Sequence, residues 1–376
     1  MAQLSAEVFK APDDQFNNTP MDIQVPEVKS YHSIIVIAAW PGVSNALANK
    51  YTSIIYNGID SGGFLVKNVS PKMVVASSGC KIFHYHWPET YLNRRPLKRW
   101  LGCLGVLSNL LLNKILGIRN VWTVHNFRPH ERGLDNGVRL FYSLLFKLTD
   151  HFIFLTNYSK MLASKKNNIP DSSISIIRHP LYPIKESDID SQKLVLNKYK
   201  IQKKYLLVFG AIRKYKNIPE IISEFTKMER SGYELLIIGR CLDLQLLRQI
   251  KNLCFSSSNL VRFYNEFVSE VDLQTLIIHS SGVIVPYVNE NSGVINLCIG
   301  LQKRALVIDS GYVREVISYF RPKNIYLAEK NIKNVDIKNF LDFKSDSENN
   351  SDDLNIESYN KNISDLHAKL YLKLLK

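Results

Sequence analysis

The chain has 376 residues and a formal net charge of +14, and 45% of its residues are hydrophobic. This composition excludes a mainly disordered chain, and 17 glycines and 14 prolines without a period exclude a collagen-like or solenoid array. The length predicts two domains or three, and the excess of cations favours an anionic partner such as a nucleotide, a nucleic acid or an acidic membrane surface.

The first 30 residues are polar and contain no apolar segment of the kind that begins a secreted protein. The five cysteines include no CxxC pair, so neither a disulfide framework nor a metal or redox motif is predicted. Both features favour a reducing compartment, and we expect to find the protein in the cytoplasm.

Short apolar runs alternate with longer mixed segments from about residue 34 onward. The runs have strand length and are rich in β-branched and aromatic residues, which predicts strands. In the first half they cover residues 33–40, 81–87, 120–127, 151–158 and 174–180. Helices are expected between them, at about 44–58, 96–117, 136–149 and 158–168.

Residues 94–119 join cationic flanks to the longest apolar run, residues 101–112. A run of 12 residues is too short to cross a membrane, which takes about 20. Residues 91–130 hold seven Lys or Arg and no acid. The segment therefore predicts either a helix that lies on an anionic membrane surface or a buried helix with basic ends.

The pattern restarts after a polar, lysine-rich stretch at 184–204, which we interpret as a linker. Further strands are predicted at 205–212, 233–240, 259–267, 282–287 and 304–311, each followed by a helical segment. Continuous apolar strands that alternate with helices predict parallel sheets. The fold class is therefore α/β, with two doubly wound, Rossmann-like domains that face each other across a cleft.

These strands place the domains at 31–183 and 205–343, after a polar extension at 1–30. The remainder, 344–376, begins with an acidic stretch that predicts an exposed loop. It ends with apolar residues at helical spacing, which predict a closing helix that packs on one of the domains.

Cations follow the first strand of the second half. Ligands of open α/β sheets bind beyond the carboxyl ends of the strands, so residues at these ends are the first candidates for a site. Arg213 and Lys216 come directly after Gly210, which allows a turn. Their side chains could neutralise a diphosphate, or they could belong to a solvated loop.

The loop after strand 282–287 adds an anion-binding pattern. Ser292 and Gly293 would open a helix, whose free N–H groups suit an anion, although Ser292 could be an ordinary helix cap. Glu290 could accept hydrogen bonds from sugar or ribose hydroxyls, or could be a surface carboxylate. Because this loop and residues 210–217 flank the same strand ends, together they favour a phosphate site.

In the first half, His84 and His86 lie on one face of a strand that ends before Trp87 and Glu89. Without an HExxH motif or cysteine ligands, no metal site is predicted here. Glu89 or a histidine could instead take a proton from an attacking hydroxyl, and Trp87 could stack on a sugar.

The next strand ends at His125, followed by Arg128 and Glu131. This strand end also faces the predicted cleft, so its polar side chains are candidates for the site. The alternative for His125 is a buried histidine whose ring is satisfied by a backbone carbonyl. Arg178 and His179 follow the last strand of this half in the same way.

At these residues the sequence resembles the GT-B-type glycosyltransferases over about residues 34–320. The features shared are a strand that ends in His125, the pair Arg213 and Lys216, and an acid before the glycine that opens a helix. The chain departs from the retaining members, because Ser292 replaces an aromatic residue and Cys298 replaces the second Glu, which usually contacts the donor ribose.

The segments HWPE, TVHNxRPHE and FGAIRxYK are more similar to bacterial exopolysaccharide and capsule transferases, including the inverting xanthan-type mannosyltransferases. The resemblance implies a catalytic base at Glu89, with His125 or Glu131 second. It implies that the acceptor side contains His86, Trp87 and Arg128. The implied donor-binding residues are Arg213, Lys216, Glu290, Asn291, Ser292, Gly293 and Asn296.

The reaction implied needs neither a metal nor a cofactor, because the nucleotide sugar is a substrate. By resemblance the donor is GDP-mannose, with a UDP-sugar second, and the acceptor is a lipid-linked oligosaccharide. The protein is then expected on the inner face of the cell membrane, held there by residues 94–119, and no nucleic acid is expected as a partner. The alternatives are a nucleotide-sugar epimerase on the same fold, a basic nucleic-acid-binding protein, and an inactive scaffold.

Overall fold

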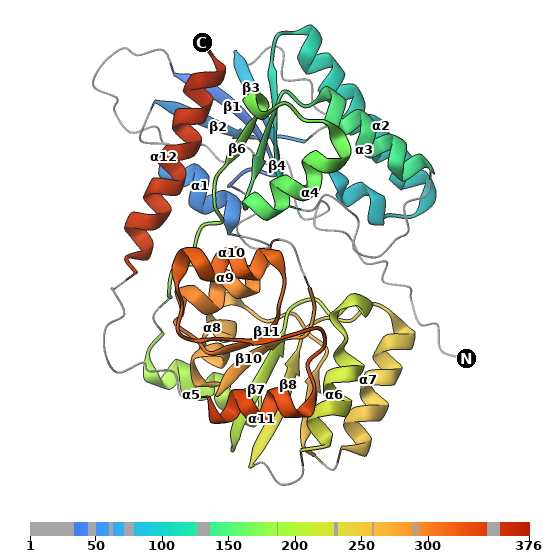
Figure 1. Cartoon of the computed structure of the whole chain (residues 1–376), viewed down its shortest axis with the longest axis vertical. Helices are drawn as coiled ribbons and strands as arrows, with labels where there is room; N and C mark the ends of the chain where they lie inside the picture. The colour runs from blue at the N-terminus through green and yellow to red at the C-terminus, as the bar shows by residue number, and fades with distance from the viewer. Residues whose placement is uncertain are drawn as a thin grey trace.

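The computed structural model of the chain describes residues 34–43, 50–59, 63–70, 79–125, 136–185, 187–228, 232–257, 259–288, 291, 293–343 and 354–376. These residues form two parallel sheets of six strands each, one above the other in the view of Figure 1.

The first sheet has the strand order β2-β1-β3-β4-β5-β6. Its strands are β1 (Ile35–Trp40), β2 (Phe64–Asn68), β3 (Cys80–Tyr85), β4 (Arg119–Val124), β5 (His151–Phe154) and β6 (Ile174–Ile176). The helical segments of this domain are α1 (Tyr51–Ile59), η5 (Pro88–Asn93), α2 (Pro96–Ile115), α3 (Asn136–Leu148), α4 (Asn157–Asn167) and η6 (Asp171–Ser173).

The second sheet has the strand order β12-β11-β10-β7-β8-β9. Its strands are β7 (Lys204–Phe209), β8 (Tyr233–Ile238), β9 (Val261–Tyr264), β10 (Gly282–Val285), β11 (Ala305–Ile308) and β12 (Ile325–Ala328). Its helical segments are α5 (Ile189–Lys198), η7 (Lys214–Lys216), α6 (Ile218–Thr226), α7 (Leu244–Ser256), α8 (Glu270–His279), α9 (Gly293–Gly300), α10 (Gly311–Phe320) and α11 (Asn334–Asp342). Helix α5 lies within the stretch that we interpreted as a linker.

The predicted fold class is confirmed, because every strand pairs in parallel with its neighbours and helices cover both faces of each sheet (Figure 1). Strands β5, β10 and β11 are buried at every position, which explains their uninterrupted apolar sequences. Of the four edge strands, β6 and β9 were predicted from the sequence, whereas β2 and β12 were not.

Each sheet contains one point at which the chain changes direction across the sheet. In the first sheet the neighbours at this point are β1 and β3, and in the second sheet they are β7 and β10. Loops that leave such neighbouring strands in opposite directions open a crevice at their carboxyl ends, where ligands of α/β proteins bind. All the candidate donor residues follow β7 or β10 in the sequence.

The last helix, α12 (Ile356–Leu374), returns to the first domain, where it packs along α1 (Figure 1). The two helices approach closely, since a side chain at Gly58 would place its Cβ 2.2 Å from the Ser364 hydroxyl oxygen. Tyr371 of α12 is fully buried in the core of this domain. The closing helix predicted from the sequence therefore completes the first domain, although it follows the second along the chain.

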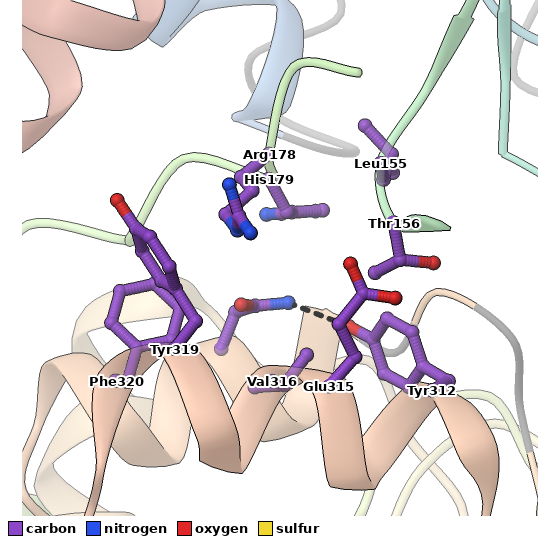
Figure 2. A pocket seen from close by; sticks show the side chains of 10 residues that line it. Leu155, Thr156, Arg178, His179, Tyr312, Glu315, Val316, Tyr319 and Phe320 are labelled. Carbon is purple, nitrogen blue, oxygen red and sulfur yellow. Dashed lines mark hydrogen bonds between the residues drawn. The ribbon is translucent and has the colours of Figure 1, made fainter. Parts of the chain in front are cut away.

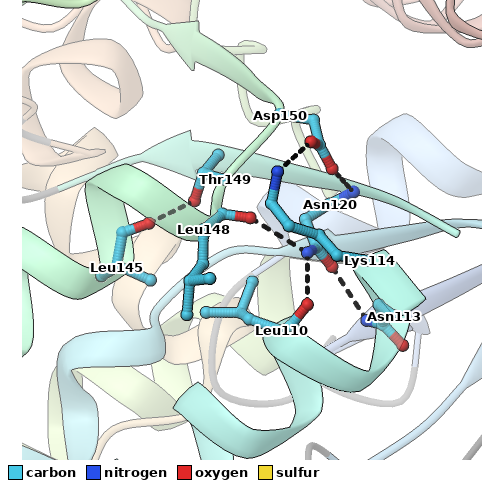
Figure 3. A network of polar contacts seen from close by, with 8 residues as sticks. All are labelled: Leu110, Asn113, Lys114, Asn120, Leu145, Leu148, Thr149 and Asp150. Carbon is cyan, nitrogen blue, oxygen red and sulfur yellow. Dashed lines mark hydrogen bonds and ion pairs between the residues drawn. The ribbon is translucent and has the colours of Figure 1, made fainter. Parts of the chain in front are cut away.

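A polar network fixes the carboxyl end of α2 to the sheet, as Figure 3 shows. The Asn120 side chain donates to the carbonyl oxygens of Leu110 and Leu148, at 2.8 and 3.1 Å. Lys114 pairs with Asp150 at 2.6 Å. Of the helices described, none is both long enough and apolar enough to cross a membrane.

Candidate functional site

The second sheet turns its chain sharply at the end of β7. Gly210 has a φ of +92°, in the left-handed region that favours glycine. A Cβ at this position would lie 3.2 Å from Nζ of Lys216. The absence of a side chain at Gly210 therefore lets the Lys216 ammonium approach the backbone just beyond the end of β7.

Lys216 holds its charge in the interior, with only 6% of its surface exposed. Its ammonium lies 4.9 Å from the ring centroid of Tyr287, and none of the carboxylates described forms an ion pair with it. Burial, and to a smaller extent the neighbouring Arg213, lowers the pKa of Lys216 to about 8. A buried cation without a counter-ion is unfavourable, so this position suits an anionic ligand.

The loops after β7 and β10 meet, as their positions in the sequence predict. The Asn217 side chain donates to the carbonyl oxygen of Pro286 at 3.0 Å. The rings of Tyr215 and Tyr287 lie edge to face, 5.6 Å apart. Helix α9 then begins at Gly293, where a Cβ would come within 3.1 Å of the Tyr182 hydroxyl. Arg213 and the start of α9 thus belong to neighbouring loops of one sheet edge.

Two asparagines near the start of α9 have structural partners. Asn291 donates to the carbonyl oxygen of His125 at 2.7 Å, which joins the two domains at the strand end of β4. Asn296 is buried and donates to the Tyr312 hydroxyl at 3.0 Å. Asn291 therefore contacts the first domain directly, whereas Asn296 is held against α10.

A small cavity of about 10 Å³ lies between the domains beside Asn296, with room for about one water molecule. Figure 2 shows Glu315 of α10 directed across it toward the loop that precedes α4. The Glu315 carboxylate accepts hydrogen bonds from the backbone N–H groups of Asn157 and Tyr158, both at 2.8 Å. The carboxylate thus binds the amino end of α4, where its negative charge is favourable.

The acceptor-side aromatic residues come together at the end of β3 and β4. Trp87 stacks on the His125 ring with centroids 4.3 Å apart. The Tyr51 ring packs edge to face against the His125 ring, with centroids 4.5 Å apart. Nδ1 of His86 lies 3.4 Å from Nε2 of His125. Burial lowers the pKa of His86 and of His125 well below the usual range, so both are neutral at physiological pH.

Glu89 lies in a different environment from these histidines. It is buried in η5, and its charge adds to the burial that raises the pKa of Tyr142 in α3. Four predicted site residues, Arg128, Glu131, Glu290 and Ser292, lie outside the described residues. The structure therefore brings together His86, Trp87 and His125. It places Arg213 beside Lys216 and puts Gly293 after the neighbouring strand, while the assignment of the base stays a prediction.

Several tyrosines contribute to these clusters although the sequence gave no reason to select them. Tyr51, Tyr56 and Tyr371 surround the histidines, and Tyr287 covers Lys216. The chain contains 19 tyrosines spread over both domains, so no local signal separates these from the rest. Within the described ranges, no group of three or more His, Cys, Asp or Glu side chains is placed to hold a metal ion.

Comparison with known proteins gives matches at the level of structure. No family model matches the sequence, and no curated protein sequence matches it. A glycosyltransferase from Rickettsia africae superimposes with a TM-score of 0.61 at 11% identity, over 92% of this chain and 100% of that one.

Two further structures bear on the choice of function. The sucrose-phosphate synthase from Thermosynechococcus elongatus gives a TM-score of 0.65 at 11% identity, over 91% of this chain and 99% of that one. The UDP-GlcNAc 2-epimerase from Neisseria meningitidis, bound to UDP-GlcNAc, gives a TM-score of 0.53 at 15% identity, over 90% of this chain and 99% of that one. Likeness at this identity concerns the fold alone, and the chain has the two-domain fold of the GT-B-type glycosyltransferases.

Proposed function

We propose that the protein is a glycosyltransferase that moves a sugar from a nucleotide-sugar donor to a lipid-linked oligosaccharide acceptor. The observation that carries this proposal is Lys216, a buried cation without a described counter-ion, placed at the reversal point of the second sheet. Arg213 precedes it in the same loop, and the amino end of α9 follows the neighbouring strand. This arrangement suits the diphosphate of a nucleotide sugar.

The proposed reaction inverts the anomeric centre in one displacement. The acceptor oxygen attacks the anomeric carbon, the bond from that carbon to the diphosphate oxygen breaks, and the nucleoside diphosphate leaves with the electron pair. Arg213 and Lys216 stabilise the charge that grows on the leaving group. A base takes the proton of the acceptor hydroxyl, and Glu89 is the first candidate, with Glu131 or His125 second.

His125 suits a hydrogen-bonding role in this reaction better than that of a base. Its ring is neutral and buried, and its pKa lies well below the usual range, which makes it a weak proton acceptor. A neutral imidazole can still orient a sugar hydroxyl by a hydrogen bond.

A panel of nucleoside diphosphates tests donor binding directly. We propose GDP-mannose as the donor and a UDP-sugar second, so GDP and UDP are compared with dTDP and ADP by thermal shift. We expect one of them to raise the melting temperature, and Lys216→Met to abolish that shift. Lys251→Met, which changes an exposed lysine on α7, is the matched control and should behave as the wild type. Equal shifts in both variants would contradict the proposal.

The acceptor proposal rests on the outer face of α2. Side chains at helical spacing expose apolar surface there, with Leu97, Leu101, Leu104, Leu111 and Ile115 each more than half exposed. Basic side chains flank this face, which suits an anionic membrane surface. Two of the cations at the ends of this segment contribute less to such a surface, because Arg99 is buried and Lys114 pairs with Asp150.

Sedimentation with lipid vesicles tests this surface. We expect the protein to bind vesicles that contain acidic lipid and to be released by high salt. Leu104→Glu should weaken binding, whereas Phe255→Glu, which alters an exposed phenylalanine on α7, should not. If vesicle binding does not change with lipid charge, with salt or with either substitution, the proposed docking of α2 on an anionic membrane is contradicted.

A nucleotide-sugar epimerase is the second candidate, favoured by the fold match to the UDP-GlcNAc 2-epimerase. The two functions differ in what they need, because an epimerase converts its nucleotide sugar without an acceptor. Incubation with UDP-GlcNAc or GDP-mannose alone, followed by product analysis, separates them. Formation of an epimeric nucleotide sugar would favour the second candidate over the first.

A further inference from the structure

A continuous path of hydrogen bonds runs from the interior of the first domain to His125 at the cleft. The Thr123 hydroxyl lies 2.8 Å from Nε2 of His84, and Nδ1 of that ring lies 2.8 Å from the hydroxyl of Tyr56. The same hydroxyl lies 2.6 Å from Nε2 of His86. Nδ1 of His86 then lies 3.4 Å from Nε2 of His125. All five side chains are buried.

The final helix of the chain joins this path at its inner end. The hydroxyl of Tyr371 in α12 lies 2.7 Å from Nδ1 of His84, on the same nitrogen that Tyr56 contacts. The residues of the path therefore come from α1, β3, β4 and α12, which are far apart in the sequence. Because these side chains are buried, their polar groups are satisfied chiefly by one another.

Counting protons assigns a direction to the path. A neutral imidazole carries one N–H, and each tyrosine has one O–H to donate. Two hydroxyls meet Nδ1 of His84. As an acceptor this nitrogen has a single lone pair for which both would compete, whereas an N–H there can be shared by two oxygens. The proton of His84 is therefore assigned to Nδ1.

Every later proton follows from that assignment. The Tyr56 and Tyr371 hydroxyls also bond each other, and with Nδ1 of His84 as a donor the Tyr371 proton goes to the Tyr56 oxygen. Tyr56 therefore accepts from His84 and Tyr371, and its own proton goes to Nε2 of His86. The N–H of His86 is then at Nδ1 and points to Nε2 of His125. His125 must accept there, which leaves its own proton on Nδ1. No described residue accepts a hydrogen bond from that nitrogen.

We propose that His84, Tyr56 and His86, together with Tyr371 of α12, are positioning residues that fix His125 as its Nδ1–H tautomer. The Trp87 and Tyr51 rings hold the plane of the imidazole, and the hydrogen-bond path decides which nitrogen can donate. The Nδ1–H group of His125 then donates to a hydroxyl or ring oxygen of the bound sugar. The identity of this ligand rests on the proposed function.

Nuclear magnetic resonance of ¹⁵N-labelled protein reads the tautomer without any substrate. We expect the His125 signals of the wild type to show a protonated Nδ1 and an unprotonated Nε2. Tyr56→Phe removes the hydroxyl between the two histidines, and His125 should then show exchange between both tautomers. Tyr205→Phe, which removes the hydroxyl of a buried tyrosine in the second domain, should leave the signals unchanged. An unchanged His125 in Tyr56→Phe would overturn the proposal.

Tyr371→Phe gives a second test, in case Tyr56→Phe disturbs folding. Without the Tyr371 hydroxyl, Nδ1 of His84 has one partner fewer, so part of the His84 population should shift its proton to Nε2. If neither ring changes state in this variant, α12 has no part in the path. Because these measurements need no nucleotide, failure of every nucleoside diphosphate to bind would refute the proposed function and leave the tautomer result standing.

Kinetics then connect the path to catalysis. With a working acceptor assay, Tyr56→Phe should lower kcat by roughly 10- to 100-fold, as substitutions of groups that orient an imidazole commonly do. The KM for the donor should change little, since the diphosphate site lies in the other domain. Equal losses in Tyr56→Phe and Tyr205→Phe would indicate a merely structural effect and contradict the positioning role.

Discussion

Lys216 carries its charge in a position where water cannot solvate it. Its pKa of about 8 lies below the ordinary value of 10.5, chiefly because of burial. Below pH 8 the side chain is an ammonium that a diphosphate would stabilise, and above pH 8 it loses its proton and the attraction with it.

Affinity for the nucleoside diphosphate should therefore fall as pH rises through about 8, by up to about tenfold per pH unit. Isothermal titration calorimetry across this range measures the dependence. Lys216→Arg keeps its charge and should remove this step, even if its overall affinity differs. A wild-type affinity that stays constant through pH 8 would show that the ammonium does not touch the ligand.

Gly239 provides a second prediction at the scale of one residue. A Cβ there would lie 1.9 Å from the carbonyl oxygen of Gly210, the residue at the phosphate turn. Gly239→Ala should push this turn away, with a loss of about 1–3 kcal/mol in the free energy of unfolding. It should also weaken nucleotide binding. Gly105→Ala, in a helix with open space around it, is the control and should be neutral or slightly stabilising in thermal melts.

The sequence predicted candidate residues better than it predicted their surroundings. Arg213 and Lys216 stand out because cations follow a strand, and the structure places them at a sheet reversal. The burial of Lys216 could not be foreseen, because Tyr287 covers it from a loop about 70 residues away along the chain. Likewise, the pair of histidines in β3 was visible, but their link to Tyr371 depends on how α12 returns.

At the scale of elements, apolar runs predicted the central strands because burial on both faces leaves no polar positions. The edge strands β2 and β12 were not predicted, whereas the edge strands β6 and β9, which bury no more of their residues, were. Burial alone therefore does not explain why β2 and β12 were missed. Helix α5 was missed because none of its residues is buried, so its sequence shows no apolar face. Its cap, in which Asp188 accepts from the backbone N–H of Ser191, is a local signal that could have located it.

The contact between α1 and α12 depends on close approach at Gly58. Its substitution by Ala would place a methyl group 2.2 Å from the Ser364 hydroxyl. We expect Gly58→Ala to destabilise the protein by about 1–3 kcal/mol in chemical denaturation. Ser364→Gly in the same chain should restore part of the loss, because it removes the clashing atoms. Destabilisation that Ser364→Gly fails to relieve would place the cause elsewhere than in this helix contact.

At the scale of the whole molecule, polar contacts hold the domains together, among them the hydrogen bond from Asn291 to the carbonyl oxygen of His125. Glu315 binds the amino end of α4 across the cavity, and Glu270 of α8 pairs with Lys50 at 2.5 Å. These contacts hold the strand ends of both sheets toward one cleft. They are few and partly exposed, so the free energy that keeps the domains in this arrangement is small.

Glu315→Ala should therefore loosen the closed arrangement without unfolding either domain. Loss of a carboxylate at a helix start removes about 0.3–1 kcal/mol of stabilisation. We expect a larger radius of gyration by small-angle X-ray scattering, while the melting temperature stays close to that of the wild type. Glu329→Ala, at an exposed position of the second domain, is the control. Identical scattering from the two variants would show that Glu315 does not hold the domains together.

The return of α12 has a consequence for how the chain is made. During translation the residues of β1 to β6 leave the ribosome first, but the core beneath β1 also needs Ile363, Leu370 and Tyr371. The second sheet, complete by β12, can fold while α12 is still being synthesised. The half of the protein that emerges first is thus finished last, and a nascent chain stalled before Ile356 would carry one mature domain and one that still waits for its final helix.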